Sequence, residues 1–276
     1  MIEALASRLL EHDRLLVLSG AGCSTRSGIG DYRDEHGAWK RAQPVQHRDF
    51  VDKHSVRQRY WARSQVGYPE FHKAEPNGAH DQLAAWENEG WVLGVITQNV
   101  DRLHQKAGSA RVIDLHGRLD RVSCLSCGSF SDRSEIQGWL EARNPHITRV
   151  GQDAIMAPDG DADLPMNVYD NVQVPDCERC GGVLKPDVVF YGDSVPREVV
   201  DAAYQWVDTC SALLVVGSSL MVFSSLRFVR KAHQLGTPVY AINRGTTRGD
   251  DLIEIKFDAD CVDALAAIQA LRSASS

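Results

Sequence analysis

Two Cys-x-x-Cys pairs are the most specific chemical pattern in this sequence. Cys124 and Cys127 form the first pair, Cys177 and Cys180 form the second, and a glycine directly follows each pair. Four thiolates suit a tetrahedral Zn²⁺ ion, and a complete set of four sulfur ligands leaves no open position for catalysis. We therefore expect one structural zinc ion, against the alternative of four free thiols. The odd total of seven cysteines also favours metal binding in a reducing compartment over a disulfide framework.

A glycine-rich turn follows the first apolar run. Gly20, Ala21 and Gly22 are small, which lets the backbone approach a ligand closely. Ser24 or Thr25 is placed to cap a following helix, whose free N–H groups would suit a phosphate. A dinucleotide fingerprint expects a third small residue where Thr25 stands and an acidic residue after the second strand. This stretch alone therefore leaves a nucleotide site and a plain turn both open.

Polar side chains follow two further expected strands. Gln98, Asn99 and Asp101 come directly after the apolar run at 91–96, and His116 follows the next run. Ligands bind at the carboxyl edge of open parallel sheets. A neutral imidazole there can act as a general base on a ribose hydroxyl or a substrate proton. The plainer interpretation is a set of turn residues and a structural histidine.

Tyr60 and Arg63 lie three residues apart in an expected helix and therefore share a face. A phenol and a guanidinium on one face can bind a polar or acidic substrate group. They are equally consistent with a surface pair, and the spacing does not decide between the two.

The elements that position these residues alternate between strand and helix, which is typical of a parallel sheet with right-handed crossovers. We expect strands at 14–18, 91–96, 111–115, 183–191, 212–216, 238–242 and 252–257, and helices at 1–11, 49–66, 80–89, 101–107, 134–143, 196–207, 224–235 and 262–271. Residues 69–78 and 144–176 are expected to be irregular. The fold class is α/β, a Rossmann-like doubly wound parallel sheet with a smaller inserted zinc-binding module and a helical segment.

The expected domains are discontinuous. Residues 1–45, 78–118 and 185–276 form the Rossmann-like domain, while the helical segment 46–77 and the zinc-binding module 119–184 form the small domain.

Composition excludes several classes of protein. The 276 residues are 43% hydrophobic and 24% charged, as in an ordinary globule. A net charge of −7 argues against general binding to nucleic acid or to anionic membranes. No apolar run reaches membrane-spanning length, and the first residues predict an amphipathic helix rather than a signal peptide. We expect a cytoplasmic, bacterial monomer.

The motifs together resemble those of the sirtuins, the NAD-dependent protein deacylases. The resemblance covers about residues 12 to 270. It rests on Gly20-Ala21-Gly22-x-Ser24-x-x-Ser27-Gly28-Ile29, Asp31-Tyr32-Arg33, Thr97-Gln98-Asn99-Val100-Asp101, Leu115-His116-Gly117, the four paired cysteines, Lys185 to Asp193, Gly217-Ser218-Ser219-Leu220 and Asn243-x-Gly245. The segment 44–63 and the long insert resemble the class II branch, which includes lipoamidase, branched-acyl deacylase and ADP-ribosyltransferase activities.

The resemblance implies a role for each matching residue. His116, Asn99 and Asp101 would be catalytic. NAD would contact Gly20, Ala21, Gly22, Ser24, Ile29, Asp31, Tyr32, Arg33, Trp39, Gln98, Asn99, Asp101, His116, Gly217, Ser218, Ser219, Asn243, Gly245 and Cys261. The acyl-lysine protein or peptide would contact Val188, Val189, Phe190, Tyr191 and Gly192, which would pair with it as a strand. Tyr60 and Arg63 would read an acidic acyl group, whereas the class II resemblance favours branched, methylglutaryl-like or lipoyl chains.

Two residues depart from the sirtuin pattern. Gly30 replaces the usual proline of the cofactor loop, and Tyr32 replaces the commoner phenylalanine beside the reaction centre. We expect these two differences to affect the reaction rate and the exclusion of water from the reaction centre more than the fold.

Two other functions remain open at this point. The same fold could serve a protein ADP-ribosyltransferase or a weakly catalytic module that binds NAD or ADP-ribose, although His116, Asn99 and Asp101 are all present. A Rossmann dehydrogenase is disfavoured by Thr25 and by the missing acidic residue.

Overall fold

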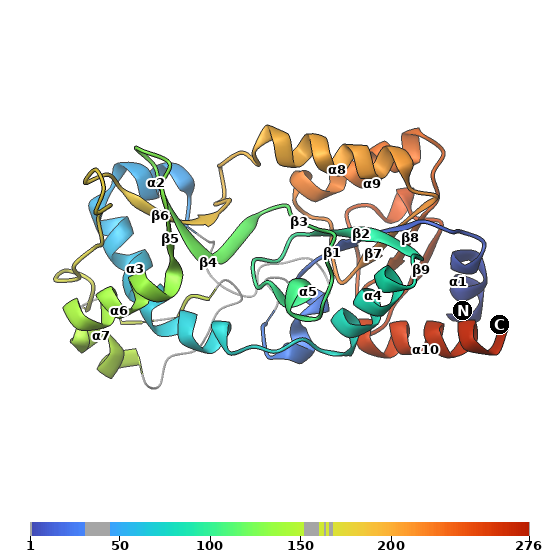
Figure 1. Ribbon diagram of the computed structural model, residues 1–276, viewed down its shortest axis with the longest axis horizontal. Coiled ribbons are helices and arrows are strands. Elements are labelled where there is room, and N and C mark those ends of the chain that lie inside the picture. The colour runs from blue at the N-terminus through green and yellow to red at the C-terminus, as the bar shows by residue number, and fades with distance from the viewer. Residues whose placement is uncertain (1, 31–44, 152–159, 163, 166–167, 276) are drawn as a thin grey trace. The chain divides into compact units, whose positions relative to one another are not determined.

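The computed structural model describes residues 2–30, 45–151, 160–162, 164–165 and 168–275 (Figure 1). The chain divides into two compact units. Unit 1 comprises Met1–Ala42, Glu75–Leu115 and Val195–Ser276, and unit 2 comprises Gln43–Ala74 and His116–Ser194. Within the described residues, no helix is both long and apolar enough to cross a membrane.

Unit 1 is built on a six-stranded parallel sheet. Its strands are β1 (Leu15–Ser19), β2 (Val92–Thr97), β3 (Val112–Asp114), β7 (Ala212–Val216), β8 (Val239–Ile242) and β9 (Ile255–Phe257), in the spatial order β3-β2-β1-β7-β8-β9. The chain runs outward from β1 in one direction and from β7 in the other. The topological switch point, where doubly wound sheets bind ligands, therefore lies between β1 and β7.

Helices cover both faces of this sheet, because side chains alternate along the buried strands. In β1, Leu15 and Val17 join one hydrophobic cluster, and Leu16 and Leu18 join the other. The first cluster packs against α1 (Ile2–Leu10), α4 (Gly78–Asn88) and α10 (Cys261–Ser275), and the second against α8 (Arg197–Thr209) and α9 (Phe223–Gln234), as Figure 1 shows. The expected doubly wound α/β fold is confirmed.

The helix expected directly after β1 does not form. The chain instead makes two short 3₁₀ turns, η1 (Ala21–Cys23) and η2 (Thr25–Ser27), neither of which has a side-chain cap. The predicted capping role of Ser24 or Thr25 is therefore wrong. Ser24 is drawn away by hydrogen bonds to the loop after β2, described below.

The described residues of unit 2 form a small antiparallel sheet and four α-helices. Its strands β4 (Gly117–Cys124), β5 (Phe130–Asp132) and β6 (Leu184–Val188) lie in the order β5-β4-β6. The helices are α2 (His47–Asp52), α3 (His54–His72), α6 (Arg133–Arg143) and α7 (Pro145–Val150). Unit 1 also contains the short α5 (Leu103–Lys106) and η5 (Asp250–Leu252).

Helix α3 runs four residues into the region expected to be a loop. Pro69 lies inside it and cannot donate to the carbonyl of Gln65. The side chain of Gln137, on α6, supplies the missing donor, since its Nε2 donates to that carbonyl at 2.8 Å. The helix continues because a partner distant in sequence satisfies the carbonyl that proline leaves free.

Two other differences concern unit 2. Helix α7 occupies the start of the stretch 144–176, which was expected to be irregular. Residues 116–118 and 185–194, expected in the Rossmann-like domain, belong to unit 2, because β4 and β6 pair with each other.

Candidate functional site

Three glycines bring the ends of β1 and β7 into backbone contact. The N–H of Gly22 donates to the carbonyl of Gly217 at 2.9 Å. Gly217 has a φ of +62°, and a Cβ built on it would lie 2.3 Å from the backbone nitrogen of Cys23. A Cβ on Gly20 would lie 2.8 Å from the Gly217 oxygen. The small residues therefore serve first to let two strand ends approach each other at the switch point, not only to admit a ligand.

Asn99, Ser24 and Asp101 form one hydrogen-bonded unit at this edge. Asn99 Nδ2 donates to the carbonyl of Gly20 at 3.1 Å and to Ser24 Oγ at 3.0 Å. Ser24 Oγ donates to Asp101 Oδ2 at 2.7 Å, and the Leu103 N–H donates to Asp101 Oδ1 at 2.9 Å. Each carboxylate oxygen of Asp101 therefore accepts a hydrogen bond, which fixes the orientation of the carboxylate. Burial raises the pKa of Asp101, and the bonds from Leu103 and Ser24 oppose that rise.

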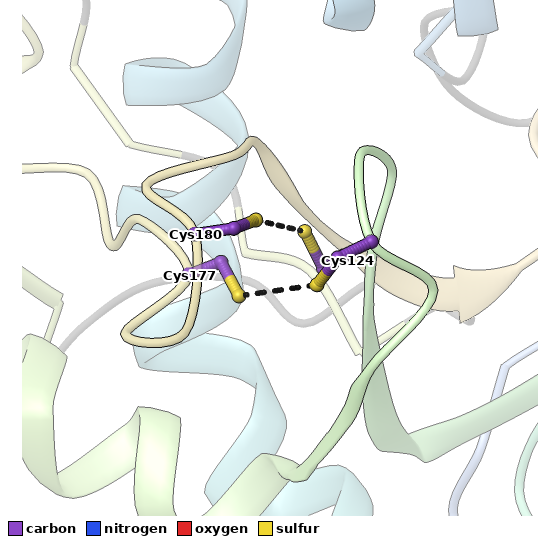
Figure 2. A group of neighbouring side chains, drawn as sticks. Cys124, Cys177 and Cys180 are labelled. Carbon is purple, nitrogen blue, oxygen red and sulfur yellow. Dashed lines mark hydrogen bonds between the residues drawn. The ribbon is translucent and has the colours of Figure 1, made fainter.

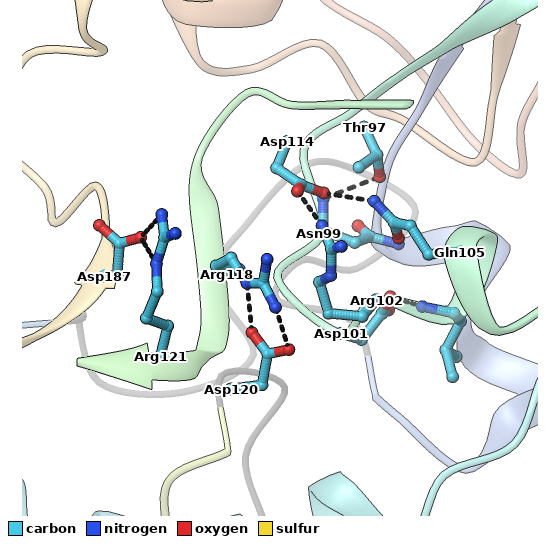
Figure 3. Close-up of polar contacts among 11 residues, drawn as sticks. Thr97, Asn99, Asp101, Arg102, Gln105, Asp114, Arg118, Asp120, Arg121 and Asp187 are labelled. Carbon is cyan, nitrogen blue, oxygen red and sulfur yellow. Dashed lines mark hydrogen bonds and ion pairs between the residues drawn. The ribbon is translucent and has the colours of Figure 1, made fainter. Parts of the chain in front are cut away.

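The loop that carries these residues is held by β3. Figure 3 shows Arg102 paired with Asp114, while Gln105 Nε2 donates to the other Asp114 oxygen at 2.9 Å. Arg102 has a φ of +65°, an uncommon conformation for a side chain that large. Such strain persists where surrounding contacts fix the backbone, and it is often found at functional sites.

Gln98 links the ends of β2 and β7 across β1. Its Nε2 donates to Ser218 Oγ at 2.6 Å, and its own N–H donates to the Ser19 carbonyl at 3.0 Å. Ser218 Oγ also accepts from the Leu220 N–H at 3.2 Å. Three neighbouring strand ends are therefore fixed in one arrangement.

Two buried histidines support the network, and the sequence analysis assigned them no role. His104 Nε2 lies 2.8 Å from Ser19 Oγ, and His80 Nε2 lies 3.4 Å from Ser24 Oγ. Burial lowers the pKa of His80 to about 4 and that of His104 to about 3, so both are neutral at pH 7. Cys23 lies within 4.8 Å of both, and burial raises its thiol pKa well above the usual value. A protonated thiol and neutral imidazoles suit hydrogen bonding in this interior.

Replacing Ser24 by alanine tests this arrangement. The Ser24 hydroxyl favours the ionised form of Asp101, and a hydrogen bond to a charged group contributes about 1.5–3 kcal/mol. We expect the acid limb of the pH–rate profile of the expected deacylation to move about one to two pH units higher, because the pKa of Asp101 rises further. Thr25→Ala is the matched control, since the neighbouring hydroxyl Thr25 Oγ1 donates to the Gly22 carbonyl at 3.2 Å rather than to Asp101. An unmoved acid limb in Ser24→Ala would remove Asp101 from the titrating groups.

Four other residues that were expected to contact NAD follow β7, β8 and β9. Asn243 is buried, and its Nδ2 donates to the Arg244 carbonyl at 2.7 Å. The Gly245 N–H donates to Asp258 Oδ2 at 3.2 Å. Cys261 begins α10, where burial raises its thiol pKa to about 12. Ser219 accepts from the Arg248 N–H through its carbonyl at 2.9 Å. Their role toward NAD stays a prediction.

Part of the expected cofactor loop lies outside the described residues, including Asp31, Tyr32, Arg33 and Trp39. Ile29 is described and is buried, with 7% exposed. Ala21 lies in η1, half-buried beside the glycine contact.

In unit 2, His116 stands at the start of β4 and is fixed there by backbone contacts. Its carbonyl accepts from the Val189 N–H at 2.8 Å, and Gly117 pairs with Val188. Gly117 has a φ of +81°, and a Cβ on it would lie 2.1 Å from the Asp187 carbonyl oxygen. Only glycine permits this approach, so the backbone of His116 is held beside the end of β6.

The expected substrate-pairing segment begins as β6 and continues irregularly. The Tyr191 carbonyl accepts from the His47 N–H at 2.8 Å, and the Phe190 carbonyl accepts from the Asp193 N–H at 3.0 Å. Gly192 has a φ of +80°. Pairing of this segment with a substrate remains a prediction.

Tyr60 and Arg63 occupy different surroundings. Tyr60 is 5% exposed and packs edge-on against Phe50 and Phe190 at centroid distances of 5.4 Å each. Arg63 Nε donates to the Ala162 carbonyl at 2.9 Å and lies 3.5 Å from a carboxylate oxygen of Asp161. The guanidinium therefore has an acidic partner within the chain.

The four paired cysteines converge in unit 2 (Figure 2). Their sulfur atoms all lie within 4.8 Å of one another, with Cys124–Cys180 at 3.5 Å and Cys127–Cys177 at 3.8 Å. A tetrahedron with Zn–S bonds of about 2.3 Å has sulfur atoms about 3.8 Å apart. None of the four is in a disulfide. The arrangement fits one structural zinc ion, as the spacing predicted.

Comparison with known proteins agrees with this geometry. The Sir2 family matches residues 20–224. This chain belongs to the Sir2 family. It is 54% identical over 266 residues to an NAD-dependent protein deacetylase of Xanthomonas campestris, a match that covers 96% of this chain and 90% of the relative. It is 46% identical to the NAD-dependent protein deacylase Sirt4 of Drosophila melanogaster, over all of this chain and 88% of that one.

A solved Sir2 structure with a p53 peptide and NAD⁺ superposes with a TM-score of 0.80 and 28% identity, covering all of both chains. The sirtuin resemblance inferred from the sequence is therefore confirmed, and the Sirt4 match agrees with the expected class II branch.

Proposed function

We propose that this Sir2 chain is an NAD-dependent protein lysine deacylase that includes deacetylase activity. The observation that carries the proposal is the Asn99–Ser24–Asp101 unit at the switch point of the sheet, in a chain 54% identical to a deacetylase. The products would be free lysine, nicotinamide and O-acyl-ADP-ribose. Its substrates would be acyl-lysine proteins or peptides, as the peptide in the related Sir2 structure suggests.

The chain would supply the edge of the unit 1 sheet that binds NAD, and a general base. NAD, when bound, supplies the ADP-ribosyl group that accepts the acyl group as nicotinamide leaves. The strand ends around Gly20, Gly217 and Ser218 would hold the nucleotide, with their geometry fixed before it binds. Asn99 and Asp101 would orient the nicotinamide carboxamide and a water molecule. His116 would accept the proton of a ribose hydroxyl at its imidazole.

The residues of the zinc centre have no part in the reaction. Four thiolates complete the coordination of the metal, so its contribution is to hold the ends of β4 and β6 together.

Peptide-dependent release of nicotinamide tests the proposal directly. Purified protein with NAD and an acetyl-lysine peptide should release nicotinamide and deacylated peptide in equal amounts. The rates with succinyl, glutaryl, hydroxymethylglutaryl and lipoyl peptides, compared with that rate, would rank the acyl groups. Transfer of labelled ADP-ribose to protein without loss of acyl groups would instead support the ADP-ribosyltransferase alternative, which the deacetylase names of the relatives do not favour.

The variant Arg63→Met tests whether Arg63 makes the protein prefer acidic acyl groups. The Arg63 guanidinium can pair with a succinyl or glutaryl carboxylate through two hydrogen bonds, although Asp161 is already beside it. If it reads acidic acyl groups, kcat/KM should fall about ten-fold or more on glutaryl peptide and less than about two-fold on acetyl peptide. Arg59→Met, one helical turn away on α3, is the control. Equal losses on both peptides would show that Arg63 does not read the acyl group.

We propose further that the protein is a monomer in a bacterial cytoplasm. The bacterial origin of several relatives supports the location. The net charge of −7 supports the absence of general nucleic-acid binding.

A further inference from the structure

Helix α9 carries a basic and aromatic stripe that the proposed reaction does not use. Its twelve residues, Phe223–Gln234, include four basic side chains counting His233 and no acidic one, in a chain of net charge −7. Its buried residues, Leu226, Phe228 and Val229 among them, pack into unit 1. Residues 223, 227, 230, 231 and 234 follow helical spacing, so they lie along one side of the helix.

Two guanidinium groups of this stripe lack an acidic partner. Among the described residues, neither Arg227 nor Arg230 forms an ion pair or a side-chain hydrogen bond, and the buried Nε of Arg227 has no acceptor. Both instead approach the ring of Phe223, with Cζ 5.0 Å and 5.8 Å from its centroid. Lys231 differs, because its Nζ lies 3.1 Å from a carboxylate oxygen of Asp208 on α8.

An open cavity of about 470 Å³ lies along the stripe. We call it the α9 groove, and it is lined by Tyr204, Phe223, Arg227, Arg230, Lys231 and Gln234. Phe223 is 53% exposed, which is uncommon for so large an apolar ring. Arginine and aromatic side chains are the types enriched at the energetic centres of protein interfaces.

We propose that the α9 groove docks an acidic polypeptide segment of a partner protein, one that presents carboxylates on both sides of an apolar side chain. The unpaired guanidinium groups would bind the carboxylates, and Phe223 and Tyr204 would receive the apolar side chain. The lining residues on α9 run from Phe223 to Gln234, which are eleven residues apart, or about 16 Å at the rise of an α-helix. That length matches about five residues of extended chain and exceeds a single anion.

Binding of a model segment tests the proposal without reference to catalysis. The probe is a fluorescein-labelled decapeptide of glutamates with one central phenylalanine, and it contains no lysine. Fluorescence anisotropy should show saturable binding that weakens as NaCl is raised, because exposed charges are screened. The double variant Arg227→Gln/Arg230→Gln should bind about ten-fold more weakly or worse, and Phe223→Ser should also weaken binding.

Arg197→Gln on α8 is the matched control. Its side chain is 93% exposed and pairs with Asp201, so its loss should leave affinity within about two-fold. Unchanged thermal unfolding of each variant would show that the fold is retained. Equal affinity of the parent and the double variant would overturn the proposal. Full displacement by millimolar inorganic phosphate, with no effect of Phe223→Ser, would also overturn it and would indicate a small-anion site.

Discussion

The variant His116→Tyr is expected to lose acyl removal almost completely while it retains its fold. His116 is the general base of the proposed reaction, and such a base contributes about 10²- to 10⁴-fold to rate. A phenol, with its pKa near 10, cannot take that proton near pH 7. The measurement is the amount of deacylated peptide formed with saturating NAD, resolved by chromatography.

The fold should survive because His116 keeps its backbone contact in the variant. Its carbonyl accepts from Val189, and that bond does not depend on the side chain. His233→Tyr, an exposed position on α9, is the matched control and should keep full activity. The unfolding temperature should match that of the parent in both variants. Retained turnover in His116→Tyr would remove the imidazole from the mechanism.

The sheet of unit 1 could be predicted because each strand is encoded locally. The run Ala212–Val216 is apolar at every position, and it forms β7 with both predicted ends. Such a run is typical of a strand buried on both faces, and a glycine or polar residue follows it where the strand leaves the sheet. The zinc centre was predictable for a similar reason, because the spacing within each cysteine pair sets the local geometry.

The contacts that hold the site residues in place could not be predicted, because they join residues that are far apart in sequence. Ser24 bonds to a residue 77 positions away, and the Arg63–Ala162 contact spans 99 positions. The spacing of Tyr60 and Arg63 correctly predicts one helix, but it carries no information about Asp161. A weak signal was available for His80, since a polar residue on the apolar side of an expected helix calls for a buried partner.

The groups that pack against the glycines could not be predicted from the sequence either. The sequence indicates where small residues gather, but it does not say what approaches them. At Gly22 and Gly217 the approaching group is the backbone of the other strand end. This contact fixes the conformation of the switch point. The edge of the sheet is therefore already ordered before the nucleotide would bind, and binding would not need to order it.

Removal of zinc should have the second large effect, on the stability of unit 2. The cysteine pairs join the end of β4 to the turn before β6, and Cys124 and Cys177 are part of the hydrophobic core that contains Phe50 and Trp61. Binding of structural zinc contributes about 10–16 kcal/mol in small zinc domains, which is comparable with the whole stability of a typical domain. Cys177→Ser should therefore reduce zinc from one ion per chain to none and unfold unit 2.

Zinc content by elemental analysis, thermal unfolding and acyl removal should be measured together on the full chain. Cys177→Ser, or the parent after prolonged chelation, should lose zinc, unfold at lower temperature and lose activity, because β6 ends beside the residues that fix His116. Cys210→Ser is the matched control, since this buried cysteine lies in unit 1 and outside the cluster. Zinc restored to the chelated parent should restore activity if the metal acts only by holding the fold. If Cys177→Ser kept both its unfolding temperature and its activity, the four sulfur atoms would be free thiols and β4 and β6 would be held by their own pairing.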